Sequence, residues 1–116
     1  LDVFVLASKP LINRDNCWEE QFGHVLIEAM ACGVATLGSS SGAIPEVLGD
    51  ERAVFEWGNA EALTKRLRVM KNDAALRTEL ARAQRGRVER HYTHDAVAEH
   101  WARFLTGLHA GKEMMP

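Results

Sequence analysis

The sequence predicts an α/β fold: the second half of a doubly wound parallel sheet, followed by helices toward the C-terminal end. Short apolar runs alternate with stretches of helical periodicity, which is typical of parallel strands joined by right-handed helical crossovers. Only about three strand candidates can be counted, whereas parallel sheets usually hold more strands and are covered on both faces. We therefore expect these strands to complete a sheet whose other strands lie outside this chain.

The strand candidates and the segments beside them define the expected sheet. The run Val3–Leu6 is continuously apolar, as in a strand that is buried on both faces. Val34–Leu37 gives the second strand, and Arg52–Glu56 gives a third, weaker one. Lys9–Trp18 contains a proline, asparagines and charges, and it is predicted to be a loop. Ligands of doubly wound folds bind at the carboxyl ends of the strands, so the loops after the first two strands are expected at the binding edge.

The first helix is predicted over Phe22–Cys32, because apolar side chains recur on one broad face and Gly33 follows as a C-terminal cap. Cys32 is expected to be a small core residue. A loop of small residues over Ser39–Ala43 leads into a short helix, where Pro45 suits the first turn because its missing N–H costs nothing there.

Longer helices complete the predicted fold. Asn59 caps the first of them, whose apolar positions are Leu63, Leu67 and Met70. The next runs from Asp73 to about Arg90, and its inward positions are Leu76, Leu80 and Ala83. Thr93 caps the last, whose apolar stripe comprises Val97, Trp101, Phe104, Leu105 and Leu108. We divide the chain into a partial binding domain over residues 1–106 and a frayed tail over residues 107–116.

Composition excludes several classes of protein. The chain has 116 residues, of which 47% are hydrophobic and 26% charged, as in one ordinary globular domain. Its net charge of −2 gives no general attraction to nucleic acid. We find neither a signal peptide nor an apolar stretch near the ~20 residues that span a bilayer, and we expect a reduced, cytoplasmic setting. The two cysteines and the histidines match no metal-binding pattern, so no metal site is expected.

Two carboxylates, Glu20 and Glu28, stand eight positions apart in the run EQFGHVLIE. Glu20 precedes a Phe-Gly corner, and Glu28 lies inside the apolar helix. The free N–H groups and the dipole of a helix that begins at a glycine suit phosphate, and carboxylates suit sugar hydroxyls. This run therefore predicts a site for a phosphorylated, hydroxyl-rich ligand.

That run resembles the E-x7-E signature of glycosyltransferase family 4. The members of this family are retaining, nucleotide-sugar-dependent enzymes with a GT-B fold. LDVFVLAS at residues 1–8 is similar to the family's strand ahead of the motif. SSSGAIPEVL at residues 39–48 is similar to its Gly-x-Ile-Pro-Glu loop and helix, and GNAEAL at residues 58–63 to a later helix start. The resemblance covers roughly residues 1–105 and implies the Rossmann-like C-terminal domain of a GT-B enzyme, which binds the sugar donor.

The resemblance also implies roles for individual residues. Glu20 is the catalytic candidate and accepts hydrogen bonds from hydroxyls of the donor sugar, whereas Glu28 accepts them from the nucleotide ribose. Phe22 and Gly23 bring the backbone close to the donor. The loop Ser41-Gly42-Ala43 offers backbone N–H groups to the diphosphate or the sugar, although the family often has two glycines where this chain has Gly42-Ala43. The expected substrate is a nucleoside diphosphate sugar of the UDP or GDP type, with no cofactor and no metal.

Partners outside this chain are implied as well. The family's acceptor-binding domain and its phosphate-contacting Arg and Lys precede the matched region, so we expect this chain alone to be inactive. The apolar stripe of the last helix would then be uncovered and favour self-association. Dispersed basic residues between Lys65 and Arg90 are typical of a solvated helical face, and a peripheral contact with anionic lipid is the alternative. Polysaccharide or glycolipid assembly is a common setting for such enzymes.

Two alternative functions stay open. A non-catalytic nucleotide-sugar-binding or scaffolding module would keep the fold without turnover, and a nucleotide-sugar epimerase has a similar architecture. A dinucleotide-dependent oxidoreductase is not favoured, because no Gly-x-Gly-x-x-Gly turn follows a strand. The sequence does not identify the base, the sugar or the acceptor.

Overall fold

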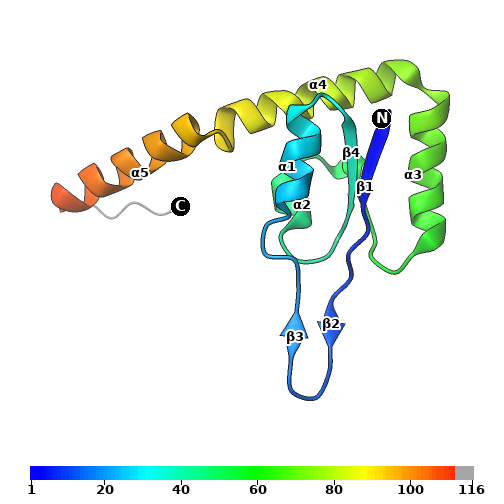
Figure 1. Ribbon diagram of the computed structural model, residues 1–116, viewed down its shortest axis with the longest axis horizontal. Coiled ribbons are helices and arrows are strands. Elements are labelled where there is room, and N and C mark those ends of the chain that lie inside the picture. Colours follow the sequence, from blue (N-terminus) through cyan, green and yellow to red (C-terminus); the bar gives the residue numbers. More distant parts are fainter. Residues whose placement is uncertain (112–116) are drawn as a thin grey trace.

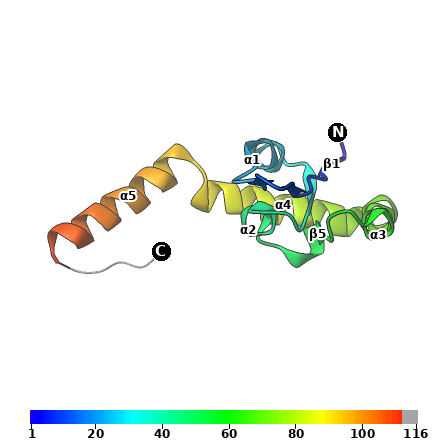
Figure 2. The same cartoon turned by 90° about the horizontal axis from the view of Figure 1, so that it is seen from below.

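The computed structural model describes residues 1–111 and contains a parallel sheet with helices on both faces (Figures 1 and 2). The strand order is β1 (Val3–Leu6), β4 (Ala35–Ser39) and β5 (Val54–Phe55). Helix α1 (His24–Ala31) covers one face of this sheet, and α2 (Ile44–Leu48) covers the other, as Figure 2 shows. The predicted α/β class is confirmed.

The remaining elements surround this sheet. An antiparallel hairpin of β2 (Leu11–Ile12) and β3 (Cys17–Trp18) projects beyond the end of β1 in Figure 1. A single 3-10 turn, η1, precedes β5. Three longer helices follow, and the last of them, α5, extends away from the sheet (Figure 1). The molecule measures 52 × 43 × 19 Å along its principal axes. Their bounds are Glu51–Ala53 for η1, Ala60–Asn72 for α3, Ala74–His91 for α4 and His94–His109 for α5.

Strand β4 lies at the centre of the fold, and all five of its residues are buried. It pairs with the whole of β1, from Val3 opposite Ala35 to Leu6 opposite Gly38. On its other edge, β5 pairs only with the last two residues of β4. Helix α2 lies directly against the strand at Gly38, where an added Cβ would stand 2.4 Å from Ile44 Cγ2. The apolar core therefore forms around β4.

A side chain pairs with the part of β4 that β5 does not reach. Gln84 on α4 is 1% exposed. Its Oε1 accepts a hydrogen bond from the Thr36 N–H at 2.9 Å, and its Nε2 donates to the Thr36 carbonyl at 2.7 Å. This is the donor and acceptor pattern that a neighbouring strand would supply. Because buried backbone groups are costly when unpaired, the amide ties α4 to the sheet.

The prediction that Lys9–Trp18 is a loop is wrong, since the segment folds into the β2–β3 hairpin. Its turn is closed by Asn13, whose Oδ1 accepts from the N–H groups of Asp15 at 3.0 Å and Asn16 at 2.7 Å. The Asn13 N–H also donates to the Asn16 carbonyl at 2.8 Å. Asparagine stabilises such turns through its side chain, and this turn chemistry was the missed signal.

Two boundaries and one burial assignment also differ from the prediction. Helix α1 begins at His24 rather than Phe22, because Gly23 takes the left-handed conformation at the helix N-cap, with φ of 79°. The predicted third strand is shorter, because Glu51–Ala53 forms η1 and leaves only β5. Cys32 is exposed rather than in the core, since it follows the last turn of α1.

Helix phase explains two further corrections. Leu67 and Ala83 were expected to face inward, but both are exposed. On α4 the buried positions are Leu80, Gln84 and Val88, so the inward face contains a glutamine that hydrophobic periodicity does not detect. The predicted caps are confirmed: Asn59 Oδ1 accepts from the Ala62 N–H and Thr93 Oγ1 from the Ala96 N–H.

The apolar stripe on α5 is largely uncovered in the described structure. Its exposed members are Val97, Trp101, Leu105 and Leu108, whereas Phe104 is half-buried and meets Trp101 edge to face. Self-association through this stripe stays a prediction. Helix α5 continues to His109, so the predicted tail starts later than Gly107. The rest of that tail, residues 112–116, lies outside the described residues.

Replacing Gln84 with leucine should lower the free energy of unfolding by about 3 kcal/mol, because it leaves the buried Thr36 N–H and carbonyl unpaired. Urea unfolding measures this change. Ala83→Leu, at an exposed position on the same helix, should change it by less than about 0.5 kcal/mol. Equal effects of the two substitutions would show that the amide does not hold α4 to β4.

Replacing Asp50 with asparagine should lower stability at neutral pH and have no effect in strong acid. The hydrogen bond from Arg52 lowers the pKa of the Asp50 carboxyl below its usual value, and the two groups form an ion pair at 2.9 Å. The stabilisation is therefore present above the unfolded pKa of about 3.9 and is lost as the pH falls through the lower folded pKa. We expect a loss below about 1 kcal/mol, since Arg52 is exposed enough for solvent to screen the pair.

Urea unfolding between pH 7 and pH 2 measures the effect of Asp50→Asn. The matched control is the same substitution in an Arg52→Gln background, where it should have little effect at any pH. A loss of stability that does not depend on pH would contradict the ion-pair explanation.

Candidate functional site

Hydrogen bonds join the segments that leave the three parallel strands at their carboxyl ends. Ser39 Oγ donates to the Ser8 carbonyl at 2.5 Å and so connects the exits of β4 and β1. The Ser40 N–H donates to the Phe55 carbonyl at 2.8 Å, and Ser40 Oγ accepts from the Trp57 N–H at 3.1 Å. Three exit segments are thus fixed to one another at the edge where ligands bind in parallel α/β sheets.

The backbone of Glu20 is held against the predicted phosphate loop. The Ala43 N–H donates to the Glu20 carbonyl at 2.9 Å. Gly42, with φ of 55°, lies so close that an added Cβ would stand 2.3 Å from the same carbonyl oxygen. The structure therefore brings Glu20 together with Gly42 and Ala43, although they lie more than twenty positions apart in the sequence.

The first turn of α1 starts next to this contact. Gly23 is buried at the N-cap, and no side chain caps the helix there. The Phe22 ring packs against two other rings. It lies edge to face with His24 at 4.9 Å and with Tyr92 at 5.6 Å. Phe22 therefore links the helix start to the end of α4, and its predicted contribution to the site is through its backbone.

Glu28 lies on the outer side of α1. Its side chain is exposed, while Leu26 and Met30 on the same helix are buried against the sheet. Helical spacing turns this carboxylate away from the core, although its neighbours in the sequence are apolar. Glu28 is accessible to a ligand that lies along the exposed face of α1.

Ser41 differs from the rest of the loop. It is 1% exposed, and its Oγ has no hydrogen-bond partner among the described residues. Its carbonyl accepts from the Ile44 N–H at 3.2 Å, which shapes the turn into α2. An unpaired buried hydroxyl is unusual, and it marks this loop as a place where a polar partner is unaccounted for.

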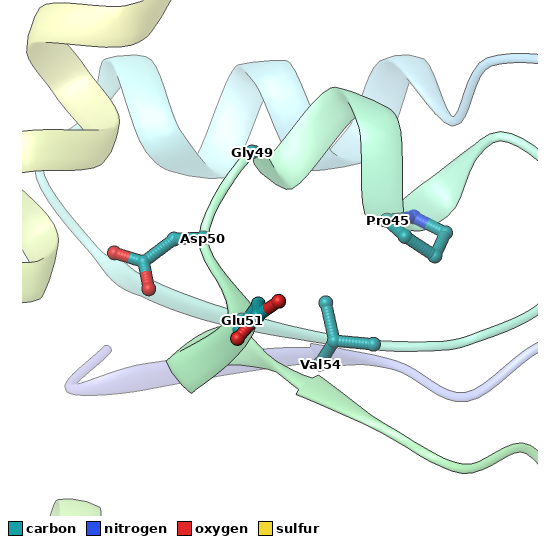
Figure 3. Close-up of a pocket in the computed structure, with 5 residues that line it drawn as sticks. All are labelled: Pro45, Gly49, Asp50, Glu51 and Val54. Atoms are coloured by element: carbon teal, nitrogen blue, oxygen red, sulfur yellow. The ribbon is translucent and has the colours of Figure 1, made fainter.

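A hollow among the described residues lies elsewhere. It measures about 340 Å³ and is lined by Pro45, Gly49, Asp50, Glu51 and Val54 (Figure 3). Figure 3 shows these residues between α2 and the start of β5, with two carboxylates among them. Asp50 is paired with Arg52, and neither carboxylate can donate a hydrogen bond to a phosphate. The carboxyl edge of the sheet, rather than this hollow, suits an anionic ligand.

The basic residues between Lys65 and Arg90 are partly committed to the fold. Arg66 donates to the carbonyls of Val54 and Glu51, and Arg77 donates to that of Met70. Arg87 donates to the carbonyls of Val47 and Glu46 and lies over the Tyr92 ring at 5.8 Å. These three guanidinium groups donate to backbone carbonyls, so fewer of the basic side chains are free to contact lipid.

Comparison with known proteins identifies the family. The family described as "Glycosyl transferases group 1" matches residues 1–87 of the chain, which include the carboxyl edge described above. The chain belongs to this family. The enzyme class predicted from the sequence, a glycosyltransferase, is thereby confirmed at the level of the family.

Individual relatives agree with the group 1 assignment. N-acetyl-alpha-D-glucosaminyl L-malate synthase of Bacillus anthracis is 31% identical over 85 residues, which are 72% of this chain and 22% of that protein. The serotype-specific mannosyltransferase WbdA of Escherichia coli is 39% identical over 61 residues, which are 53% of this chain and 8% of that protein.

A solved structure also resembles the group 1 chain. The sucrose-phosphate synthase of Thermosynechococcus elongatus superposes with a TM-score of 0.72 at 26% identity, covering 96% of this chain and 26% of that one. This likeness confirms the predicted GT-B architecture. The chain spans about a quarter or less of the length of these relatives.

Within residues 1–111 of this glycosyltransferase chain, no helix is long and apolar enough to cross a lipid bilayer. Over the same range, no group of three or more histidine, cysteine, aspartate or glutamate side chains is placed to hold a metal ion. The predictions of a cytoplasmic location and of metal independence are not tested by these observations and stay predictions.

Replacing Gly42 with alanine should destabilise the group 1 chain more than an alanine at another left-handed glycine. Gly58 is the matched control, since its φ is 72° and nothing lies within 4 Å of its added Cβ. Gly58→Ala should cost about 1–2 kcal/mol for backbone strain alone. Gly42→Ala should lower the free energy of unfolding further, because its Cβ also clashes with the Glu20 backbone. Urea unfolding measures both, and equal losses would contradict the close contact.

Proposed function

We propose that this chain is the donor-binding part of a retaining glycosyltransferase, which moves a sugar from a nucleoside diphosphate to an acceptor hydroxyl. The observation that carries the proposal is the contact between the Glu20 backbone and Gly42-Ala43. This contact holds the backbone of the first glutamate of the E-x7-E run beside a loop of small residues and close to the N-terminal turn of α1. Carboxylates suit sugar hydroxyls, and backbone N–H groups suit phosphate.

Each end of the donor is assigned to different residues. The Glu20 carboxylate accepts hydrogen bonds from the hydroxyls of the sugar to be transferred. The Glu28 carboxylate, exposed on the outer face of α1, accepts from the two ribose hydroxyls. Phe22 and Gly23 bring their backbone close to the donor, and Gly42 and Ala43 approach the diphosphate between the two acids.

The unpaired Ser41 hydroxyl supports this placement of the diphosphate. A buried hydroxyl without a partner costs free energy, and an oxygen of a phosphate bound to the loop would accept its hydrogen bond. The acidic hollow beside Asp50 and Glu51 offers no comparable group. The preferred donor is of the UDP or GDP type, as the resemblance implies.

The proposed reaction transfers one glycosyl group. The bond between the anomeric carbon and the diphosphate oxygen breaks, and its electron pair stays on that oxygen. The acceptor oxygen bonds to the same face of the anomeric carbon, and the acceptor hydroxyl passes its proton to the departing diphosphate oxygen. Charge develops on the departing diphosphate, so N–H groups of the loop and of the first turn of α1 stabilise it most in the transition state.

Turnover is assigned to a longer protein. The chain covers 22% of one relative and 26% of the structural neighbour. We expect residues 1–116 by themselves to bind the donor without transferring the sugar, because the acceptor must be bound from another side. Contacts of this chain with an acceptor domain or with a membrane surface are part of the same proposal.

Replacing Glu28 with alanine should weaken binding of the preferred nucleotide sugar about tenfold or more, because the ribose loses a bidentate acceptor. Ligand-observed NMR against UDP-, GDP- and ADP-sugars measures the affinities and identifies the base. Glu61→Ala, which removes an exposed carboxylate from α3, is the control and should bind normally. Binding that survives Glu28→Ala would contradict the ribose assignment.

A further inference from the structure

The β2–β3 hairpin exposes apolar side chains beside the candidate donor site. Leu11 is 59% exposed, Ile12 73% and Trp18 47%. A two-stranded hairpin has little stability of its own and gains none from apolar groups that face water. The packing of the described residues therefore does not explain why these side chains occupy the hairpin.

Both ends of the hairpin segment are fixed to the same loop. At its start, the Ser8 carbonyl accepts from Ser39 Oγ at 2.5 Å. At its end, the Glu20 carbonyl accepts from the Ala43 N–H at 2.9 Å. Both donors belong to the segment that leaves β4. The hairpin is thus held at the carboxyl edge of the sheet, where Figure 1 shows it extending beyond the strand ends.

The strand register separates the exposed side chains into two faces. Leu11 lies opposite Trp18, and Ile12 lies opposite Cys17, so the two pairs point to opposite sides of the hairpin. The Leu11–Trp18 pair is the one nearer to the two anchoring hydrogen bonds. Trp18 also stands only two residues before Glu20, so the indole and the carboxylate belong to neighbouring positions at the base of the hairpin.

This pair of groups matches the two kinds of surface on a sugar ring. A pyranose has faces of C–H groups, which pack on an aromatic ring, and edges of hydroxyls, which donate to a carboxylate. We propose that Trp18, with Leu11 across from it, forms a contact surface for the hexose ring of the donor, next to Glu20. This inference rests on the proposed function and extends it to a residue outside the E-x7-E run.

The surrounding charges favour a sugar over a lipid surface. Glu19 and Glu20 directly follow Trp18, whereas Lys9 starts the segment and the hairpin turn contains both Arg14 and Asp15. Carboxylates at this position oppose an approach to anionic headgroups but accept hydrogen bonds from hydroxyls. A neutral, hydroxyl-rich ring is therefore the occupant that fits both the indole and the acids.

Saturation-transfer NMR with UDP-glucose and GDP-mannose tests the inference, because it reports the hexose, ribose and base protons separately. In Trp18→Ala the hexose protons should lose most of their saturation, while the ribose and base protons keep theirs. The dissociation constant should rise about 3-fold to 10-fold. Trp18→Phe should retain most of the effect, because it keeps an aromatic face.

Ile12→Ala is the matched control, since it removes an exposed apolar side chain from the opposite face of the same hairpin. It should leave all ligand signals unchanged. Urea unfolding of each variant checks that the exposed substitutions leave the fold intact, with changes below about 0.5 kcal/mol.

Three results would overturn the hexose contact: no hexose saturation with the unaltered chain, unchanged hexose saturation in Trp18→Ala, or an equal loss in Ile12→Ala. A different result would show that the proposed nucleotide site is wrong. In that case ribose saturation would survive Glu28→Ala, while hexose saturation would still depend on Trp18.

Discussion

The complete burial of β4 imposes the constraint on which the other elements depend. Every N–H and carbonyl of this strand needs a partner, because none of them reaches water. One edge is satisfied by β1 along its whole length. The other edge is divided between the two-residue β5 and the amide of Gln84. The placement of α4, and of α3 before it, follows from this division.

The same strand also positions the site. Where β4 ends, its exit segment continues to satisfy backbone groups, but now those of other segments: Ser39 reaches Ser8, Ser40 reaches Phe55, and Ala43 reaches Glu20. The candidate site is therefore assembled by hydrogen bonds to main-chain carbonyls rather than by contacts among its functional side chains. This arrangement holds the Glu20 backbone in place without using its carboxylate.

Much of this could be predicted from the sequence, and the exceptions share a physical cause. Apolar runs and helix caps predicted β1, β4 and the long helices, and the resemblance named both Glu20 and Gly42-Ala43, whose backbones meet at the carboxyl edge. Gln84 was missed because a polar side chain on an apolar face carries no hydrophobic signal. The hairpin was missed because its strands have two residues each and its turn depends on Asn13.

The anchoring of the hairpin at both ends has a consequence for how such enzymes diversify. Residues 9–19 leave and rejoin the sheet at points that the exit of β4 holds fixed, so their length and composition can change while the frame stays the same. The entropy of closing a loop grows slowly with its length, by about 0.6 kcal/mol for each doubling. This segment can accordingly be exchanged for one of different length and composition while the fold around it is kept.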